Sequence, residues 1–103
     1  MKLMTKTIAK SLPEIGTTDG QGYSAVAKVK YFTPWDSWTW YGTEYEPETE
    51  RMYGLVVSPI ETTLGTFSVA ELQSVKGPFF LNIERDLHFQ PQTLADCLMR
   101  HPA

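Results

Sequence analysis

The sequence predicts an α+β fold, with an antiparallel sheet of four or five strands and two or three short helices. Two observations predict it. Apolar and polar residues alternate in several stretches between residues 25 and 58, as expected of half-buried strands. Helical spacing of apolar residues, with one clear helix start at Ser68, marks segments outside these stretches. Short strands and short helices together are typical of a sheet that has helices against its faces or edges.

Three strand candidates follow one another in the middle of the chain. In residues 25–32, small or apolar side chains alternate with Lys28 and Lys30. Residues 37–45 alternate again and are rich in aromatic residues and threonine, which favour strands. Residues 51–58 form an apolar run that suits a central strand. Because polar turns separate the three candidates, we expect them to pair antiparallel.

Three short helices and one further strand are expected in the rest of the chain. Ser68 and Glu71 have the spacing of a capping box, in which the serine side chain accepts from a backbone N–H and the glutamate reaches back. Near both ends of the chain, apolar residues recur at helical spacing. The helices are expected at residues 5–12, 69–75 and 93–99, and the strand at residues 79–83 with a polar continuation to residue 89.

The composition indicates one small cytoplasmic domain, residues 1–103. A chain of 103 residues, 42% of them hydrophobic, is long enough for one core and short for two domains. The lone Cys97 excludes an intrachain disulfide and favours a reducing compartment. There is no apolar run of signal-peptide or membrane-spanning length, so no membrane contact is expected. The net charge of −3 gives no general attraction to nucleic acid.

An aromatic segment in the middle of the chain is the main candidate for a binding surface. Strict alternation places Trp38 and Trp40 on one face of a strand, and Tyr41 and Tyr45 on the other. Trp35 precedes this strand, in a turn where no strand face requires its burial. We expect one face to be buried and the other to be in water. The candidate binding residues are Trp35, Trp38, Trp40, Tyr41 and Tyr45.

Two interpretations of this segment stay open. In one, the tryptophans pack in the core and the tyrosines cover the sheet, because aromatic side chains bury large areas. In the other, the segment is an exposed platform for a partner, because Trp and Tyr are enriched at the energetic centres of interfaces. The sequence does not decide whether the aromatic cluster is core or surface.

Glu84, Asp86 and His88 are the candidates for catalysis. If residues 84–89 are extended, these three side chains share one face, opposite Arg85. Two carboxylates and an imidazole can bind a metal ion or act as acid and base, as in a small metal-dependent hydrolase or nuclease. The other interpretation is a charged strand edge that discourages aggregation. The sequence predicts no cofactor and assigns no metal site.

Lys28 and Lys30 offer a third candidate surface. They share a strand face and adjoin aromatic residues, an arrangement in which lysines track a nucleic acid backbone while rings stack on bases. Two lysines on a solvated strand face are the simpler interpretation. A single-strand nucleic acid binder is therefore an alternative to a protein-binding module.

Common catalytic motifs are missing from the sequence. It contains no phosphate-binding loop of the Gly-x-x-x-x-Gly-Lys-Ser/Thr type, no Gly-x-Gly-x-x-Gly fingerprint and no Gly-x-Ser-x-Gly elbow. Cys97 lies beside Leu94 and Leu98 on an apolar helical face, where a buried and inert thiol is expected. The sequence leaves enzymatic activity uncertain and favours a protein without it.

Three motifs carry a resemblance to a known family. They are Phe32-Thr33-Pro34-Trp35-x-x-Trp38-Thr39-Trp40-Tyr41-x-Thr43-Glu44, then Leu64-Gly65-x-Phe67-Ser68-x-x-Glu71-Leu72, then Ile83-Glu84-Arg85-Asp86-Leu87-x-Phe89. In this order they resemble a bacterial family catalogued as domain of unknown function 2958, over about residues 3–94. The resemblance implies small proteins often carried on plasmids, phages and integrative elements. It implies no catalytic residues.

These observations favour one function over two others. We expect a non-enzymatic protein-binding module of a mobile genetic element, with a host or element-encoded protein as its partner. The alternatives are the metal-dependent hydrolase or nuclease and the single-strand nucleic acid binder. A homo-oligomer is also left open, because an aromatic patch that closes a dimer and one that binds a partner look alike in sequence.

Overall fold

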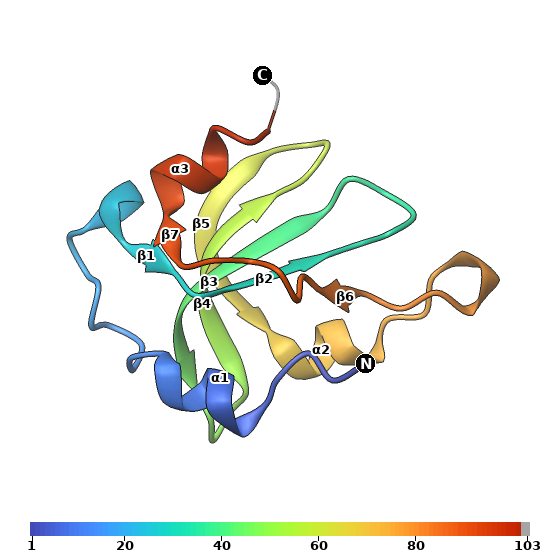
Figure 1. Ribbon diagram of the computed structural model, residues 1–103, viewed down its shortest axis with the longest axis horizontal. Coiled ribbons are helices and arrows are strands. Elements are labelled where there is room, and N and C mark those ends of the chain that lie inside the picture. The colour runs from blue at the N-terminus through green and yellow to red at the C-terminus, as the bar shows by residue number, and fades with distance from the viewer. Residues whose placement is uncertain (102–103) are drawn as a thin grey trace.

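A five-stranded antiparallel sheet forms the centre of the structure, a computed structural model that describes residues 1–101 (Figure 1). The last two positions of the expected domain, residues 102 and 103, lie outside the described residues. The strand order is β5 (Thr62–Ser68), β4 (Arg51–Val57), β3 (Thr39–Glu46), β2 (Val29–Phe32) and β6 (Glu84–Arg85). A separate two-stranded sheet pairs β1 (Val26–Ala27) with β7 (Gln92–Thr93). The predicted α+β fold is confirmed.

Three short α-helices lie at the expected positions. They are α1 (Lys6–Ser11), α2 (Val69–Ser74) and α3 (Leu94–Leu98). Each begins after a hydroxyl residue, Thr5, Ser68 or Thr93, whose side chain accepts a hydrogen bond from a backbone N–H of the first turn. The helix that the capping box predicts therefore starts at Val69, as expected. None of the helices between residues 1 and 101 has the length and apolar character needed to cross a bilayer.

Helices cover both faces of the sheet and bury a core on each. On one face, α1 and α2 pack over a cluster that includes Tyr31, Trp40 and Met52. On the other face, α3 brings Leu94 and Cys97 against a second cluster, which includes residues of β3 and β4. Figure 1 shows the sheet between α3 on one side and α1 and α2 on the other. The central strands are consequently enclosed between two layers.

A β-bulge at Thr43 changes the face of the sheet on which the following residues of β3 lie. The register with β4 shifts between Gly42 and Glu44, which makes Thr43 an extra residue in the ladder. Because side chains alternate along a strand, the extra residue moves Tyr45 to the face of Trp40. Both residues belong to the first core. Strict alternation, which placed the two residues on opposite faces, is therefore wrong for this strand.

The expectation that one face of this strand is in water is also wrong. Every residue from 39 to 45 is buried, and Tyr41 and Tyr45 have exposed fractions of only 0% and 5%. The physical reason is the helical layer on each face. Polar groups within the strand are satisfied internally, since the Thr43 hydroxyl donates to the Tyr53 carbonyl oxygen at 3.0 Å.

Other local predictions are corrected by the structure. The expected strand at residues 25–32 is split at Lys28 into β1 and β2, which belong to different sheets. The expected strand at residues 79–83 does not form, because Gly77 and Pro78 open a tight turn, η2 (Pro78–Phe80). Strand β5 was not predicted from the residue pattern, because its threonines give no clear alternation of polar and apolar side chains.

Candidate protein-binding site

The aromatic residues expected to bind a partner are mostly buried. Trp40 is in the first core and stacks on Trp38, with ring centres 5.8 Å apart. Trp38 and Trp35 are partly buried and pack against the same core. An exposed platform made of the whole cluster does not exist in this structure.

Tyr41 packs in the second core, on the face of the sheet that α3 covers. Its hydroxyl oxygen lies 2.7 Å from His101 Nε2, and the centre of its ring lies 5.9 Å from the centre of the Phe89 ring. Burial raises the pKa of Tyr41 to about 12. Burial also raises the pKa of Tyr45 and lowers that of His101. Tyr41 and His101 tie the end of α3 to the sheet, whereas Tyr45 is buried in the first core on the opposite face.

Trp35 lies in the turn between β2 and β3 and braces a distant segment. Its ring lies against the backbone of Gly77, where an added Cβ atom would come within 2.6 Å of the ring. Gly77 belongs to residues 75–83, which connect α2 to β6 and are called the aromatic loop here. Glycine is needed at this point because the indole occupies the space of a side chain. Trp35 therefore fixes the base of the aromatic loop.

The tip of the aromatic loop holds two phenylalanines in solvent. Phe79 and Phe80 are 92% and 94% exposed. The loop is closed beneath them by two backbone hydrogen bonds, from Gly77 N–H to the Leu81 carbonyl at 2.8 Å and from Leu81 N–H to the Pro78 carbonyl at 3.1 Å. Figure 1 shows this loop extending away from the rest of the molecule. The two rings are thus displayed on an ordered turn.

Both phenylalanines have backbone strain. Their φ angles are +56° and +62°, in the left-handed region that residues with a Cβ atom avoid. Such a conformation costs on the order of 1–3 kcal/mol per residue, and it is concentrated at functional sites. Burying each ring would contribute about 1.5–3 kcal/mol. Within residues 1–101 neither ring obtains that stabilisation, so both remain available to a partner.

Sequence reasoning missed this site although a signal is present. The apolar residues after Gly77-Pro78 were assigned to a strand at residues 79–83. A Gly-Pro turn followed directly by two aromatic residues also fits a surface loop whose tip exposes two aromatic side chains. Apolar character alone does not separate a buried strand from an exposed anchor.

The two lysines expected to track a nucleic acid are each engaged within the protein. Lys30 Nζ lies 3.7 Å from Asp86 Oδ2 and 5.9 Å from the centre of the Tyr41 ring. Lys28 Nζ donates to the Ser11 carbonyl oxygen at 2.8 Å. Each ammonium group therefore already has a polar partner within the protein.

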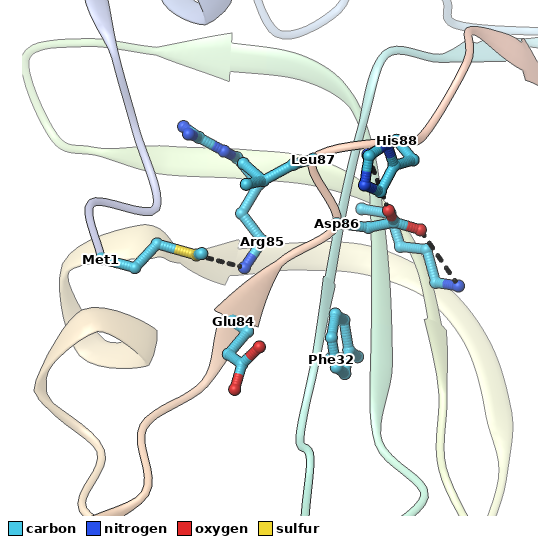
Figure 2. A pocket seen from close by; sticks show the side chains of 8 residues that line it. Met1, Phe32, Glu84, Arg85, Asp86, Leu87 and His88 are labelled. Atoms are coloured by element: carbon cyan, nitrogen blue, oxygen red, sulfur yellow. Dashed lines mark hydrogen bonds and ion pairs between the residues drawn. The ribbon is translucent and has the colours of Figure 1, made fainter.

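Glu84, Asp86 and His88 do not share one face. Only Glu84 and Arg85 are extended in β6, because the Asp86 carboxylate accepts the His88 backbone N–H at 2.9 Å and starts a turn. Figure 2 shows the Glu84 carboxylate directed away from the other two side chains. The expectation of an extended stretch to residue 89 is wrong for this reason.

A shallow pocket of 380 Å³ lies over this stretch and is bounded by β2, β6 and Met1 (Figure 2). Asp86, its central carboxylate, is already paired with Lys30. In the part of the chain that the structure describes, no three His, Cys, Asp or Glu side chains come together as metal ligands.

A buried carboxylate, Glu44, has a structural role that the sequence did not indicate. It is 1% exposed and accepts from the Gly16 N–H at 3.0 Å and from the backbone N–H and hydroxyl of Thr18. Burial raises the pKa of Glu44, but these three hydrogen bonds outweigh it, so the pKa lies below its usual value. Glu44 anchors the loop after α1 to the sheet.

The geometry defines a small α+β protein with a two-sided core and a projecting aromatic loop. The family model described as "Protein of unknown function (DUF2958)" matches residues 3–98, and the chain belongs to this family. The resemblance carried by the three motifs is thereby confirmed. No curated protein and no solved structure matches the chain.

Proposed function

We propose that the protein is a non-enzymatic binding module that docks on another protein through Phe79 and Phe80. One observation carries the proposal: two adjacent, almost fully exposed phenylalanines stand on a strained turn that Trp35 braces. Together the two rings would contribute about 3–6 kcal/mol on burial, the amount expected of an interface anchor. An apolar pocket on the partner is the complement of such a tip.

The charges near the tip favour a protein over a membrane or a nucleic acid. Lys76 is the one basic residue within residues 75–83, and the whole chain has a net charge of −3. Insertion of aromatic residues into an anionic membrane is normally supported by several Lys and Arg residues. Nucleic acid binding requires similar clusters. The aromatic loop has neither.

One residue of the aromatic segment predicted from the sequence, Trp35, contributes to this proposal by supporting the loop. Trp35 contacts the loop at Gly77, whereas Trp38 is partly buried beside the first core and Trp40, Tyr41 and Tyr45 are buried in the two cores. The alternatives have less support: Lys28 and Lys30 are engaged, and Glu84, Asp86 and His88 do not converge. We therefore retain protein binding as the function.

Two further parts of the proposal concern context. We place the module in the cytoplasm, which the single buried thiol of Cys97 supports. We take the partner to be a host protein or a product of the mobile element that carries the gene, in keeping with the occurrence on plasmids and phages that the family resemblance implies.

A capture experiment tests the proposal. The immobilised wild-type protein and the double variant Phe79→Ser/Phe80→Ser are incubated with lysate of the native host, and proteins that only the wild type retains are identified. Ile60→Ser is the matched control, because Ile60 is an exposed apolar residue outside the aromatic loop. A purified candidate should then bind wild type and Ile60→Ser alike, and the double variant at least about tenfold more weakly. Equal binding of all three would refute the proposal.

A further inference from the structure

The two edges of the five-stranded sheet differ in how they are protected. The β6 edge consists of two residues, both charged, and the Arg85 N–H donates to the Met1 sulfur at 3.2 Å. Short length, charge and a covering segment are the usual means of preventing edge-to-edge pairing. The β6 edge has all three.

The β5 edge has none of these protections. Its seven residues, Thr62–Ser68, pair with β4 in unbroken register, so no bulge interrupts the strand. The strand contains neither a charged residue nor a proline. Within residues 1–101 no strand lies beyond β5 in the sheet. Alternate backbone N–H and C=O groups along about 23 Å of strand are left for another chain.

The side chains of β5 suit pairing with a second copy of the same strand. In an antiparallel pair with Gly65 on the two-fold axis, Phe67 lies opposite Thr63 of the second copy, and Leu64 opposite Thr66. Each pair combines a large apolar group with a threonine, and cross-strand pairs of this kind are favourable. A two-fold axis brings equivalent residues close together, and an uncharged strand creates no like-charge contact there.

The half-buried residues of β5 agree with this arrangement. Leu64 packs at the border of the second core and Phe67 at the border of the first, on opposite faces of the sheet. Both are partly exposed because the sheet ends at β5. A further strand would cover both residues and extend both cores at once.

We propose that the β5 edge is a self-association surface, through which two copies join their sheets antiparallel. This contact is independent of the aromatic loop. Because one strand buries less than the roughly 1,000 Å² of a stable complex, we expect a reversible dimer with a dissociation constant in the micromolar range.

Gly65 allows a selective test. A Cβ atom built on Gly65 meets no atom within 4 Å, and its φ is not in the left-handed region, so a longer side chain fits the monomer. In the proposed dimer, Gly65→Lys places two ammonium groups directly opposite each other. Gly65→Ser is the matched neutral variant.

The measurement is multi-angle light scattering over a concentration series from micromolar to millimolar. Wild type and Gly65→Ser should move from the 11.7 kDa chain mass toward twice that value, while Gly65→Lys keeps the single-chain mass. Circular dichroism checks that each variant is folded. Gly65→Asp, which also places two like charges opposite each other, replaces Gly65→Lys if the latter does not fold.

Three outcomes would overturn the proposal. The first is a wild type that stays at the single-chain mass throughout. The second is folded Gly65→Lys that dimerises as wild type does. The third is loss of the dimer in Phe79→Ser/Phe80→Ser, which would assign self-association to the aromatic loop. Partner capture through that loop is measured separately, so either proposal can fail alone.

Discussion

The indole ring of Trp35 lies against the backbone of Gly77, joining the β2–β3 turn to the base of the aromatic loop across 42 positions of sequence (77 − 35). The contact leaves no room for a side chain at residue 77. Trp35 also packs against the first core. The contact with Gly77 therefore connects the sheet to the loop that carries Phe79 and Phe80.

Replacing Trp35 with alanine should affect both stability and binding. Because the ring is partly buried against the first core, Trp35→Ala should lower the free energy of unfolding by about 2 kcal/mol. It should also weaken partner binding, since the loop base loses its support. Trp35→Phe keeps an aromatic ring and should retain most of both. Urea unfolding and a binding titration measure the two effects, and an unchanged unfolding midpoint for Trp35→Ala would contradict the bracing role.

Replacing the tip phenylalanines with glycine should separate stability from function. Glycine adopts positive φ without strain, so Phe79→Gly should raise the free energy of unfolding by about 1 kcal/mol while removing a binding ring. Phe80→Gly should behave similarly. Met99→Gly is the control: Met99 is exposed but has an ordinary φ of −63°, so glycine there should destabilise. If both tip variants lowered stability as Met99→Gly does, the strain argument would fail.

Glu44 should make stability depend on pH in the acid range. Its folded-state pKa lies below the ordinary value of 4.5, so the unfolded chain binds more protons on acidification. The contribution of Glu44 is therefore complete above pH 4.5 and is lost as the pH falls through the folded-state pKa. Glu44→Gln should lower stability at neutral pH by about 2 kcal/mol and flatten this pH dependence.

The exposed Glu48 provides the comparison for Glu44, since Glu48→Gln should leave both stability and its pH profile nearly unchanged. Unfolding midpoints in urea between neutral pH and about pH 3 measure the difference. A Glu44→Gln profile parallel to wild type would show that other carboxylates cause the acid dependence.

Cys97 should be unreactive in the folded protein. Burial raises the pKa of its thiol from 9.0 to about 11, which lowers the thiolate fraction near pH 8 by about a hundredfold. The side chain is also fully buried under α3. A small thiol reagent should therefore modify the protein slowly in buffer, through its transiently open form, and rapidly in concentrated urea. Rapid reaction of folded protein would show that α3 opens.

The sequence predicted those features that depend on neighbouring residues. Ser68 and Glu71 define the start of α2 through contacts three residues apart, and the structure shows the Ser68 hydroxyl accepting from the Glu71 N–H at 3.1 Å. The strands around residues 39–46 and 51–57 were found because β-branched and aromatic residues favour extended chain. Local rules were sufficient for both.

The parts that were missed depend on contacts between distant segments. Burial of Tyr41 comes from α3, more than 50 positions later (94 − 41), and no alternation within β3 reveals that cover. Phe79 is exposed at the tip of a loop whose base at Gly77 contacts Trp35, 42 positions earlier in the chain (77 − 35). Of the expected binding residues, Trp35 contacts the base of the proposed site, while the residues that form its tip were assigned to a strand.

The extra residue at Thr43 has a consequence for how this family can change over time. Gly42 pairs with Gly54, and Glu44 pairs with the adjacent residue Tyr53, so deleting Thr43 alone would leave Tyr45 on the face of Trp40 and Glu44 opposite Tyr53. An insertion in the exposed turn at residues 47–50 would disturb neither. In relatives of this protein, length differences should therefore collect in that turn and at the extra residue of β3, while the rest of β3 keeps a constant number of residues.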